Sequence, residues 1–481
     1  MRASFLGFEI AKKALNASQK GLDVVGQNIS NVNTEGYTRQ RVDLCAVASE
    51  RGSYFYSNST TADVGLGVDV RGIIQVRDQV LDYKFRKENA INNTWNKSLS
   101  GLQDIENIID EYKTAGLGAE LESFYDKLQS FSHDTSSIEK AGLLRSAAQK
   151  VSQVFNRFSE HLNQIKDLKK EELGIVVSDL NELVNKISKL NTEIKGALVA
   201  GYNPNELLDI RNTYLDKLSG YTNITVEAQN DGTVAIKTGE NYLLSQEQQI
   251  NTIHLGSGEP VALYNSDSSE YITANGEIFA HLQLLNGKGV YAADGESQFQ
   301  GVPYYQQSLD YLAGKFADVF NTLNAQDGVD KPLFSGDSGG NITAANIEVS
   351  SAWLSDAMYI TSTTETPPSS GAADNISRMI QEFDAKHTIS PAFTGSFLEH
   401  ITSLNADIAM DVSYYQDMAE TSDVVIISVN EQRESVTGVS LDEESINLIR
   451  FQKAYSAAAR VMTTLDEALD IIINRMGVVG R

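Results

Sequence analysis

Apolar side chains recur every three or four residues near the C-terminal end of the sequence, between Leu441 and Val479. The positions of this C-terminal stripe are Leu448, Phe451, Tyr455, Ala458, Met462, Leu465, Leu469, Ile472, Met476 and Val479. Charged residues such as Arg450, Lys453 and Asp466 occupy other faces of the same predicted helix. The spacing is the heptad pattern of a narrow seam that packs against another helix as a coiled coil.

A second stripe with the same spacing lies close to the N-terminus. Its positions are Phe8, Ala11, Leu15, Ser18, Leu22, Val25, Ile29 and Val32. Two such stripes at opposite ends of one chain predict an antiparallel helix pair formed by the termini. Because isolated helices are only marginally stable in water, we expect the pair to become stably folded only when neighbouring copies cover its remaining surface. The alternative is that both segments are ordinary core helices of one globular domain.

Proline placement indicates where long helices can form. All seven prolines lie between Pro204 and Pro391, and proline interrupts helix interiors, so the flanking regions are free to form long rods. Helical spacing predicts helices over Met1–Val32, from Val80 onward, and over Ala119–Ser132, Ser137–Val199, Tyr304–Ala325, Asn375–Lys386 and Gly395–Val436. The heptad phase of the longest helix slips near Lys169–Gly174, as a stutter in a coiled coil does.

Beyond Leu218 the apolar period changes from helical to two. Ile224–Val226 and Val234–Ile236 flank the turn sequence Asn230-Asp231-Gly232, which predicts a β-hairpin. Short predicted strands continue towards Gln300 and form a β insertion, which we expect at the tip of the rod. The stretch Asp327–Gly371 is rich in Gly, Ser and Thr and is compatible with loops, with strands, or with both.

The predicted fold is mainly α with inserted β structure: a terminal antiparallel coiled-coil pair, a long helical-bundle rod and a β-rich domain inserted in the middle. We assign residues 1–45 and 438–481 to the terminal pair, 46–222, 300–326 and 372–437 to the rod, and 223–299, with or without 327–371, to the β-rich domain.

Charge is distributed unevenly along the chain. The net charge is −25, which argues against nucleic-acid binding, because phosphate contacts need basic patches. Residues 1–45 have six basic and four acidic side chains and residues 438–481 have five and six, so the ends sum to +1 and the middle to −26. We expect near-neutral ends to pack together in many copies while the acidic middle stays solvated.

Several site and localisation classes are disfavoured by residue content. Cys45 is the only cysteine, which excludes an internal disulfide and a thiolate zinc site. The most apolar short stretch, Val424–Val429, is far too brief to cross a bilayer, so we expect no membrane insertion. The N-terminal sequence lacks the apolar core of a secretory signal, so we expect any export to use a route without a cleaved signal.

No catalytic or cofactor-binding constellation emerges from the sequence. The six histidines show no metal-ligand spacing, and neither a His-Glu-x-x-His motif nor a phosphate-binding loop is present. Gly336–Gly340 matches the pentapeptide around the nucleophile of trypsin-like proteases. That chemistry also needs a histidine base and a buried aspartate on a double β-barrel, and only His254 and His281 lie upstream in contexts typical of strands. We therefore expect no enzyme activity, no cofactor and no metal.

Six segments, spread along the chain in the same order as in the family, resemble one family. Gln27–Arg39 resembles the N-terminal signature of bacterial flagellar rod, hook and hook-associated proteins, and Gly65–Val70 with Arg77–Leu81 is similar to the next segment of hook-associated proteins. Leu441–Tyr455 resembles the C-terminal signature of the hook-associated protein 1 family. Asn205–Arg211 and Thr343–Ile347 are similar to further pieces of the same family. The β insertion matches least.

The resemblance implies a structural role outside the cell. Members of such families are exported unfolded through the flagellar type III apparatus and polymerise at the distal end of the hook, where a ring of identical subunits forms the hook–filament junction. The implied partners are hook protein below, the second hook–filament junction protein above, and an export chaperone on the C-terminal helix. The expected assembly interface comprises Leu15, Leu22, Val25, Asn28, Ile29, Asn31, Gly36, Tyr37, Leu448, Phe451, Tyr455, Met462, Leu465, Leu469, Ile472 and Met476.

Other functions remain open at this point. A related axial protein, namely hook-associated protein 3, hook protein or flagellin, is the nearest alternative, and the Leu441–Tyr455 segment and the chain length disfavour it. An axial scaffold whose β domain acts as a surface adhesin is a second. A type III secretion translocator is a third, but it would need apolar segments long enough to insert into membranes.

Overall fold

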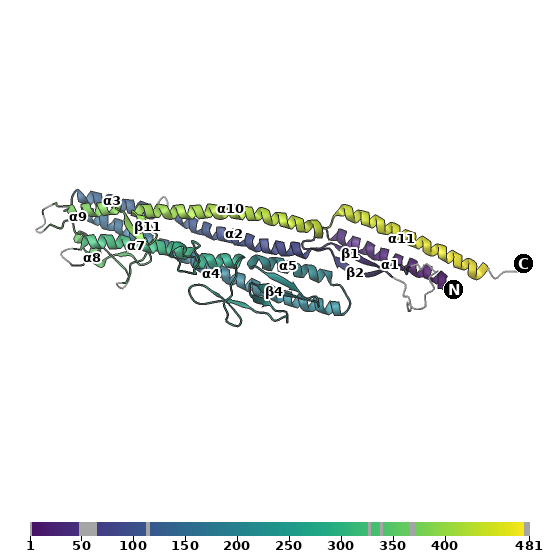
Figure 1. Cartoon of the computed structure of the whole chain (residues 1–481). Coiled ribbons are helices and arrows are strands. Elements are labelled where there is room, and N and C mark those ends of the chain that lie inside the picture. Colours follow the sequence, from purple (N-terminus) through teal and green to yellow (C-terminus); the bar gives the residue numbers. More distant parts are fainter. Residues whose placement is uncertain are drawn as a thin grey trace.

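The computed structural model describes residues 2–47, 65–111, 116–325, 329–336, 340–365, 369 and 371–475. These residues form an elongated rod, and the first and last helices lie together at one end of it (Figure 1). Helices run along the length of the rod, and small antiparallel sheets are attached to them. The prediction of a mainly α fold with inserted β structure is confirmed.

The terminal helices pair with each other. Helix α1 (Arg2–Ser30) packs against α11 (Leu441–Asp470), which continues into a short π-helical segment, η4 (Ile471–Arg475). Gly7 of α1 lies against Leu465, and Gly21 lies against Phe451, so the two helices run antiparallel. The antiparallel pairing that the two heptad stripes predict is confirmed.

A two-stranded sheet covers a further side of α1. Strands β1 (Gln40–Ala46) and β2 (Val68–Gln75) are antiparallel, with an irregularity in register between Asp43 and Leu44. Gly67, just before β2, lies against Ile10 of α1. The helix pair and this sheet form one end of the molecule, which we call the terminal unit.

Helices α2 (Gln79–Glu111) and α10 (Phe397–Thr437) lie side by side along the rod (Figure 1). Helix α10 begins with a capping box, in which the Ser396 side chain accepts a hydrogen bond from the Glu399 N–H and the Glu399 carboxylate accepts one from the Ser396 N–H. The helix ends before Gly438, and the Ser440 side chain caps the start of α11. The chain therefore changes direction at residues 438–440, where the rod meets the terminal unit.

Helix α4 (Ile138–Val199) is the longest element of the rod. Its 62 residues span about 90 Å at 1.5 Å per residue. It starts beside α3 (Leu117–Ser132) at the far end and returns to the terminal unit, where the Asn203 side-chain amide donates to the backbone oxygen of Ile73 in β2. The helix continues without a break through residues 169–174, where the heptad phase predicts a stutter.

The far end of the rod holds an aromatic core, which we call the distal core. It is formed by α3, α4, α7 (Val302–Asn324), α9 (Asp374–Asp384) and the start of α10. Its large, fully buried side chains include Phe124, Phe131, Phe155, Phe316, Phe320, Phe334, Trp353 and Phe397. Several of these rings meet edge to face, an arrangement that adds to the stabilisation from burial.

Short elements between α7 and α10 close the distal core. They are β8 (Phe334–Ser335), β9 (Glu348–Val349), α8 (Ser351–Ser355), η3 (Ala357–Tyr359), β10 (His387–Ser390) and β11 (Phe393–Gly395). Leu333, Ile347 and Trp353 bury their side chains there. The described part of Asp327–Gly371 thus packs with the distal core, whereas the strands after Thr225 contribute to a different core.

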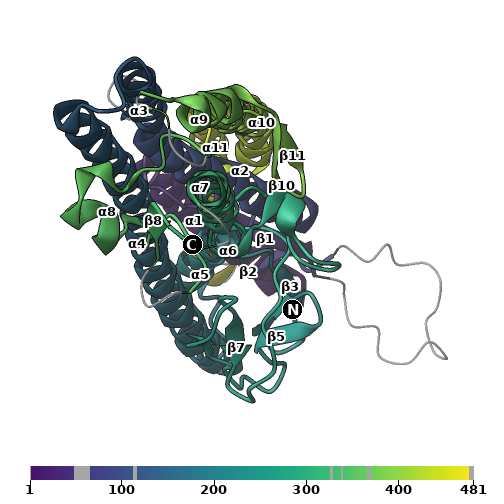
Figure 2. The same cartoon turned by 90° about the vertical axis from the view of Figure 1, so that its left-hand side faces the viewer.

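The β-rich region packs against the second half of α4. It comprises α5 (Asn205–Tyr221), β3 (Thr225–Ala228), β4 (Val234–Thr238), β5 (Asn241–Leu244), β6 (Ile253–Leu255), β7 (Leu263–Asn265), α6 (Glu277–Asn286) and η1 (Gly289–Tyr291). The predicted hairpin is confirmed as β3 and β4, with Gly232 in the turn at a φ of +83°. Figure 2 looks along the rod and shows these strands on one side of the helices.

Two expectations for this region are wrong. The β region lies beside the middle of the rod and not at its tip, because α4 carries the chain back towards the terminal unit before the strands begin (Figure 1). Residues 277–286 form a helix where short strands were expected. Ile278, His281 and Leu285 recur at helical spacing, and all three are buried. His281 therefore lies on a helix and not in a strand.

Candidate functional site

The face of α1 that meets α11 is built from small side chains. Gly7, Ala11, Ser18, Gly21 and Val25 follow heptad spacing, and Ala11, Ser18 and Val25 are buried. A Cβ atom added to Gly21 would lie 2.5 Å from the Phe451 ring, and one added to Gly7 would lie 3.0 Å from a Leu465 methyl group. Contacts as short as the first do not occur between real atoms, so the close approach of the helices requires glycine at position 21.

This contact line agrees with only part of the predicted N-terminal stripe. It shares Ala11, Ser18 and Val25 with that stripe but runs through Gly21 rather than Leu22. Leu15, Leu22 and Ile29 are partly buried beside the line. The observed contact line is displaced from the predicted stripe by about one position because of side-chain size. Small residues permit the closest approach of the two helices, and larger side chains flank the contact.

The C-terminal stripe meets α1 through its middle. Ala458 is buried, and the partly buried positions are Phe451, Met462, Leu465 and Leu469. Leu448, Tyr455 and Ile472 are 38%, 40% and 52% exposed. Met476 lies outside the described residues. Pairing within one chain thus buries only part of the stripe and leaves Leu448, Tyr455 and Ile472 largely accessible.

The Gln27–Arg39 segment is held together by its own hydrogen bonds. The Asn28 amide, 1% exposed, donates to the backbone oxygen of Gln40 and accepts from its N–H, at 2.9 and 3.0 Å. The Tyr37 hydroxyl donates to the same Asn28 oxygen at 2.8 Å. Burial, followed by the charges of nearby carboxylates, raises the pKa of Tyr37 to about 12, so this hydroxyl keeps its proton. Asn28 and Tyr37 therefore connect the end of α1 to β1.

Asn31 and Gly36 shape the turn between α1 and β1. The Asn31 amide donates to the backbone oxygen of Gln27, and its side-chain oxygen accepts from the Thr34 hydroxyl. Gly36 has a φ of +78°, and a Cβ there would lie 2.5 Å from the Thr213 hydroxyl of α5. The side-chain hydrogen bonds require asparagine at position 31, and the backbone angle and the close contact require glycine at position 36. These requirements hold within one chain, whatever further contacts the residues make in an assembly.

A charged clamp joins β1 to the start of α11. The Arg39 guanidinium donates to Glu444 at 2.8 Å and to Glu443 at 2.6 Å, and its backbone N–H donates to Thr437 at 2.8 Å. Glu444 is 2% exposed, so Arg39 compensates a carboxylate removed from water. Sequence reasoning missed this clamp, because more than 400 positions separate its partners along the chain.

A second charged network joins α2, α5 and α10 next to the terminal unit. Asp216 of α5 accepts from Arg86 of α2 at 2.8 Å and from Arg433 of α10 at 2.6 Å. The Arg433 guanidinium also lies 3.8 Å from the centre of the Phe85 ring, a cation–π contact. Three helices that are distant in sequence are thus fixed at the joint next to residues 438–440.

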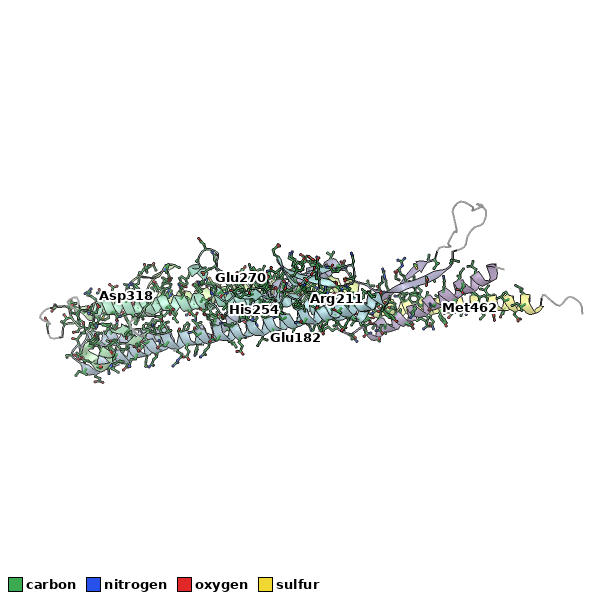
Figure 3. All side chains as sticks on the ribbon, turned by 90° about the horizontal axis from the view of Figure 1, so that it is seen from below. Glu182, Arg211, His254, Glu270, Asp318 and Met462 are labelled. Carbon is green, nitrogen blue, oxygen red and sulfur yellow. The ribbon has the colours of Figure 1, made fainter. Side chains whose placement is uncertain are left out.

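Apolar side chains of the terminal helix remain exposed on faces turned away from α1. We call Leu441, Ile446, Ile449, Val461 and Ile473 the outer set, and each is at least half exposed. Met462 marks this end of the molecule in Figure 3, opposite Asp318 of α7. Exposed apolar side chains in such number, beside a helix pair with a thin core, are typical of an interaction surface.

Chemistry-bearing residues do not assemble into a reactive site in the part of the chain that the structure describes. No group of three or more His, Cys, Asp or Glu side chains suited to a metal ion occurs there. Asp337, Ser338 and Gly339 of the protease-like pentapeptide lie outside the described residues. His254 is exposed on β6, while His281 is buried near Glu277 and Glu172. Among the described helices, none combines the length and the apolarity that a bilayer span requires.

Three family models match parts of the chain. Residues 102–342 match the model described as "Flagellar hook-associated protein FlgK helical domain". Residues 8–38 match "Flagella basal body rod protein", and residues 432–476 match "Flagellar basal body rod FlgEFG protein C-terminal". The last two ranges cover most of α1 with the turn after it, and α11.

Similar proteins cover the whole chain. The sequence is 30% identical over 517 residues to flagellar hook-associated protein 1 of Bacillus subtilis, with 100% of both chains covered. It is 24% identical over 554 residues to flagellar hook-associated protein 1 of Escherichia coli, covering 96% of this chain and 98% of that one. The solved structure of the flagellar hook junction protein FlgK from Burkholderia pseudomallei covers 74% of this chain and 100% of its own, with a TM-score of 0.62 and 11% identity, which shows a shared fold.

Proposed function

This chain belongs to the flagellar hook-associated protein 1 family and is a structural component of the bacterial flagellum at the hook–filament junction; we propose that its paired terminal helices build that junction. The full-length similarity favours this family over hook-associated protein 3, hook protein and flagellin. As an axial protein of the flagellum it assembles with copies of itself and has neighbours in the hook and the filament. The role that we propose is structural and involves no catalysis.

One observation carries the proposed mechanism. The α1–α11 pair buries a thin line of small residues and leaves the outer set exposed, whereas the rod has an aromatic core of its own. A helix pair with so little buried surface gains most from neighbours that cover its outer faces. In this proposal a ring of identical subunits forms an inner tube from α1 and α11, with the rod packed outside it.

The remaining partners are those that the resemblance to the family implies. Hook protein contacts the ring from below and the second hook–filament junction protein from above, through terminal helices of the same kind. The near-neutral charge of the ends supports this stacking, because an acidic surface like that of the middle would repel identical neighbours. Asn28, Asn31, Gly36 and Tyr37 contribute by holding α1 and β1 in the shape that the ring requires.

The exposed stripe also supports the proposed export route. Before assembly, an export chaperone covers the apolar margins of α11, since an amphipathic helix binds an apolar groove through such positions. The chain then leaves the cell unfolded, without a cleaved signal, and pairs its termini at the end of the hook. The mature location is extracellular, at the hook–filament junction.

A matched pair of substitutions tests the proposal. Val461→Asp places a charge within the outer set, at a position that is 51% exposed. Ile138→Asp places the same charge at the far end of the rod, on an apolar position that is 71% exposed. In cells that lack the native protein, we expect Val461→Asp to give hooks without filaments and to release filament subunits into the medium. Ile138→Asp should support normal filaments.

The readouts are electron microscopy of the hooks, swimming motility and the amount of filament subunit in the medium. Circular dichroism of both purified variants checks that the monomer keeps its helical content. Normal filaments with Val461→Asp would contradict the proposal, because a half-exposed valine buried between subunits cannot tolerate a carboxylate.

A further inference from the structure

A cavity of about 500 Å³ lies where the rod meets the terminal unit. It is bounded by β2, α2, the start of α5 and the sheet of β3 and β4. Its lining combines apolar side chains, such as those of Leu208, Leu215 and Ile224, with basic ones. The charged side chains that line it are the guanidinium groups of Arg77, Arg86 and Arg211 and one carboxylate, that of Asp82.

Arg211 is the unusual member of this group. It is 7% exposed, and among the described residues no carboxylate lies within 4 Å of it. One of its terminal nitrogens donates to the Asn191 side chain at 3.0 Å and to the backbone oxygen of Gly232 at 2.7 Å, while its buried Nε has no partner. Figure 3 shows Arg211 close to the joint with the terminal unit.

The neighbouring charges do not compensate this cation. Asp82 forms a two-point ion pair with Arg77, through contacts of 2.5 and 2.9 Å. Asp216 is shared between Arg86 and Arg433. Burial, followed by the nearby charges of Arg86 and Arg77, lowers the pKa of Arg211 to about 10, which still leaves it charged at neutral pH. A buried and unpaired cation is costly.

The backbone adds to the positive potential of the cavity. Helix α5 begins there, and its first residue, Asn205, lines the wall together with the preceding Pro204. The residue before the helix is Pro204, which provides no side-chain cap for the N–H groups of the first turn. A helix start of this kind attracts anions, although Glu206 in the same turn offsets part of the effect.

We propose that this cavity binds an oxyanion group, either a carboxylate or a phosphate, carried on a small molecule with an apolar part. The guanidinium groups bind the oxyanion through paired N–H donors, the geometry for which arginine is suited. The leucine and isoleucine side chains receive the apolar part. Binding holds β2, α2 and α5 together and therefore stiffens the joint between rod and terminal unit.

The test uses the full-length monomer and two probes, inorganic phosphate and benzoate. Each probe is titrated against sodium chloride of equal ionic strength, and the midpoint of thermal unfolding is measured. We expect at least one probe, at about ten times its dissociation constant, to raise the midpoint by about 2 °C beyond chloride. A response to phosphate alone identifies a phosphate site, and a response to benzoate identifies a carboxylate site with an apolar part.

Variants at two arginines separate binding from general salt effects. Arg211→Met should lose most of the response, and Arg211→Lys, which keeps the charge, should retain about half of it. Arg145→Met is the matched control, because the Arg145 guanidinium also donates to two backbone oxygens but lies on α4 beside α8, away from the cavity. It should keep the full response. The proposal is overturned if neither probe exceeds chloride, or if Arg211→Met responds as the native protein does.

Discussion

The distal core and the terminal helix pair are both helix packings, yet they differ in how complete they are within one chain. In the distal core, large aromatic side chains from several helices interlock and reach full burial. In the terminal pair, two helices meet along glycine, alanine and serine, and large apolar side chains face outward. On the basis of this difference we propose that the rod folds by itself and that other subunits complete the terminal pair.

Removing an aromatic ring from the distal core should have the largest effect on stability. Phe316 is fully buried, and the rings of Phe124, Phe155, Phe320 and Phe397 lie within 6.4 Å of it. Phe316→Ala should reduce the free energy of unfolding of the rod by about 4 kcal/mol, measured by urea denaturation. A loss below about 1 kcal/mol would show that the rod does not depend on this core.

Two separate glycine substitutions within α1 test the contact line with α11, and their expected effects on stability are of intermediate size. Gly21→Ala should destabilise the terminal pair by about 2 kcal/mol, because the new methyl group meets the Phe451 ring. Gly26→Ala, with no atom within 4 Å of its Cβ, should instead stabilise α1 by up to about 1 kcal/mol through helix propensity.

Protection of the α1 amides from hydrogen exchange measures the change in stability caused by each substitution. The amides of the rod serve as the internal reference. Equal effects of the two alanines would mean that α1 does not approach α11 as closely as Gly21 indicates. An effect that spreads into the distal core would mean that the rod and the terminal pair unfold together.

The smallest expected effect is a pH dependence confined to the middle of the rod. Burial, followed by the charge of Asp407, raises the pKa of Asp411 to about 6, above its ordinary value of 3.8. Because folding favours the protonated form, this group's contribution to stability is present below about pH 4 and is lost as the pH rises through 6. Partial exposure limits the change to about 1 kcal/mol.

Asp411→Asn should remove this dependence, and Asp417→Asn, at an exposed position of the same helix, should not. Urea denaturation at pH values between 4 and 7 measures both variants. A native-like pH profile in Asp411→Asn would assign the dependence to another group.

Local periodicity was enough to predict much of the fold. The long helices, the β3–β4 hairpin and the antiparallel pairing of the termini follow from spacing that is visible in short windows of sequence. The position of the β region beside the rod and the helical state of residues 277–286 do not follow from such local spacing. Both depend on where α4 ends in the fold and on what the segments after it pack against. Tertiary contacts overrode the local pattern there.

The site was predicted less completely. Heptad spacing located the α11 stripe, but on α1 it favoured the large Leu22 over the small Gly21 that forms the contact. The Arg39 clamp and the Asp216 network were missed, because ion pairs between distant positions leave no local pattern. The glycines themselves were the available signal, since Gly7 and Gly21 are fourteen positions apart, a whole number of heptads.

Hydrogen exchange of the terminal helices in two states tests the central claim most directly. We expect amides of α1 and α11 to exchange rapidly in the monomer and to become protected in isolated hooks that carry the protein. Amides of α4 and α7 in the distal core should be protected in both states. Terminal helices as protected in the monomer as the distal core, with no gain on assembly, would contradict the account.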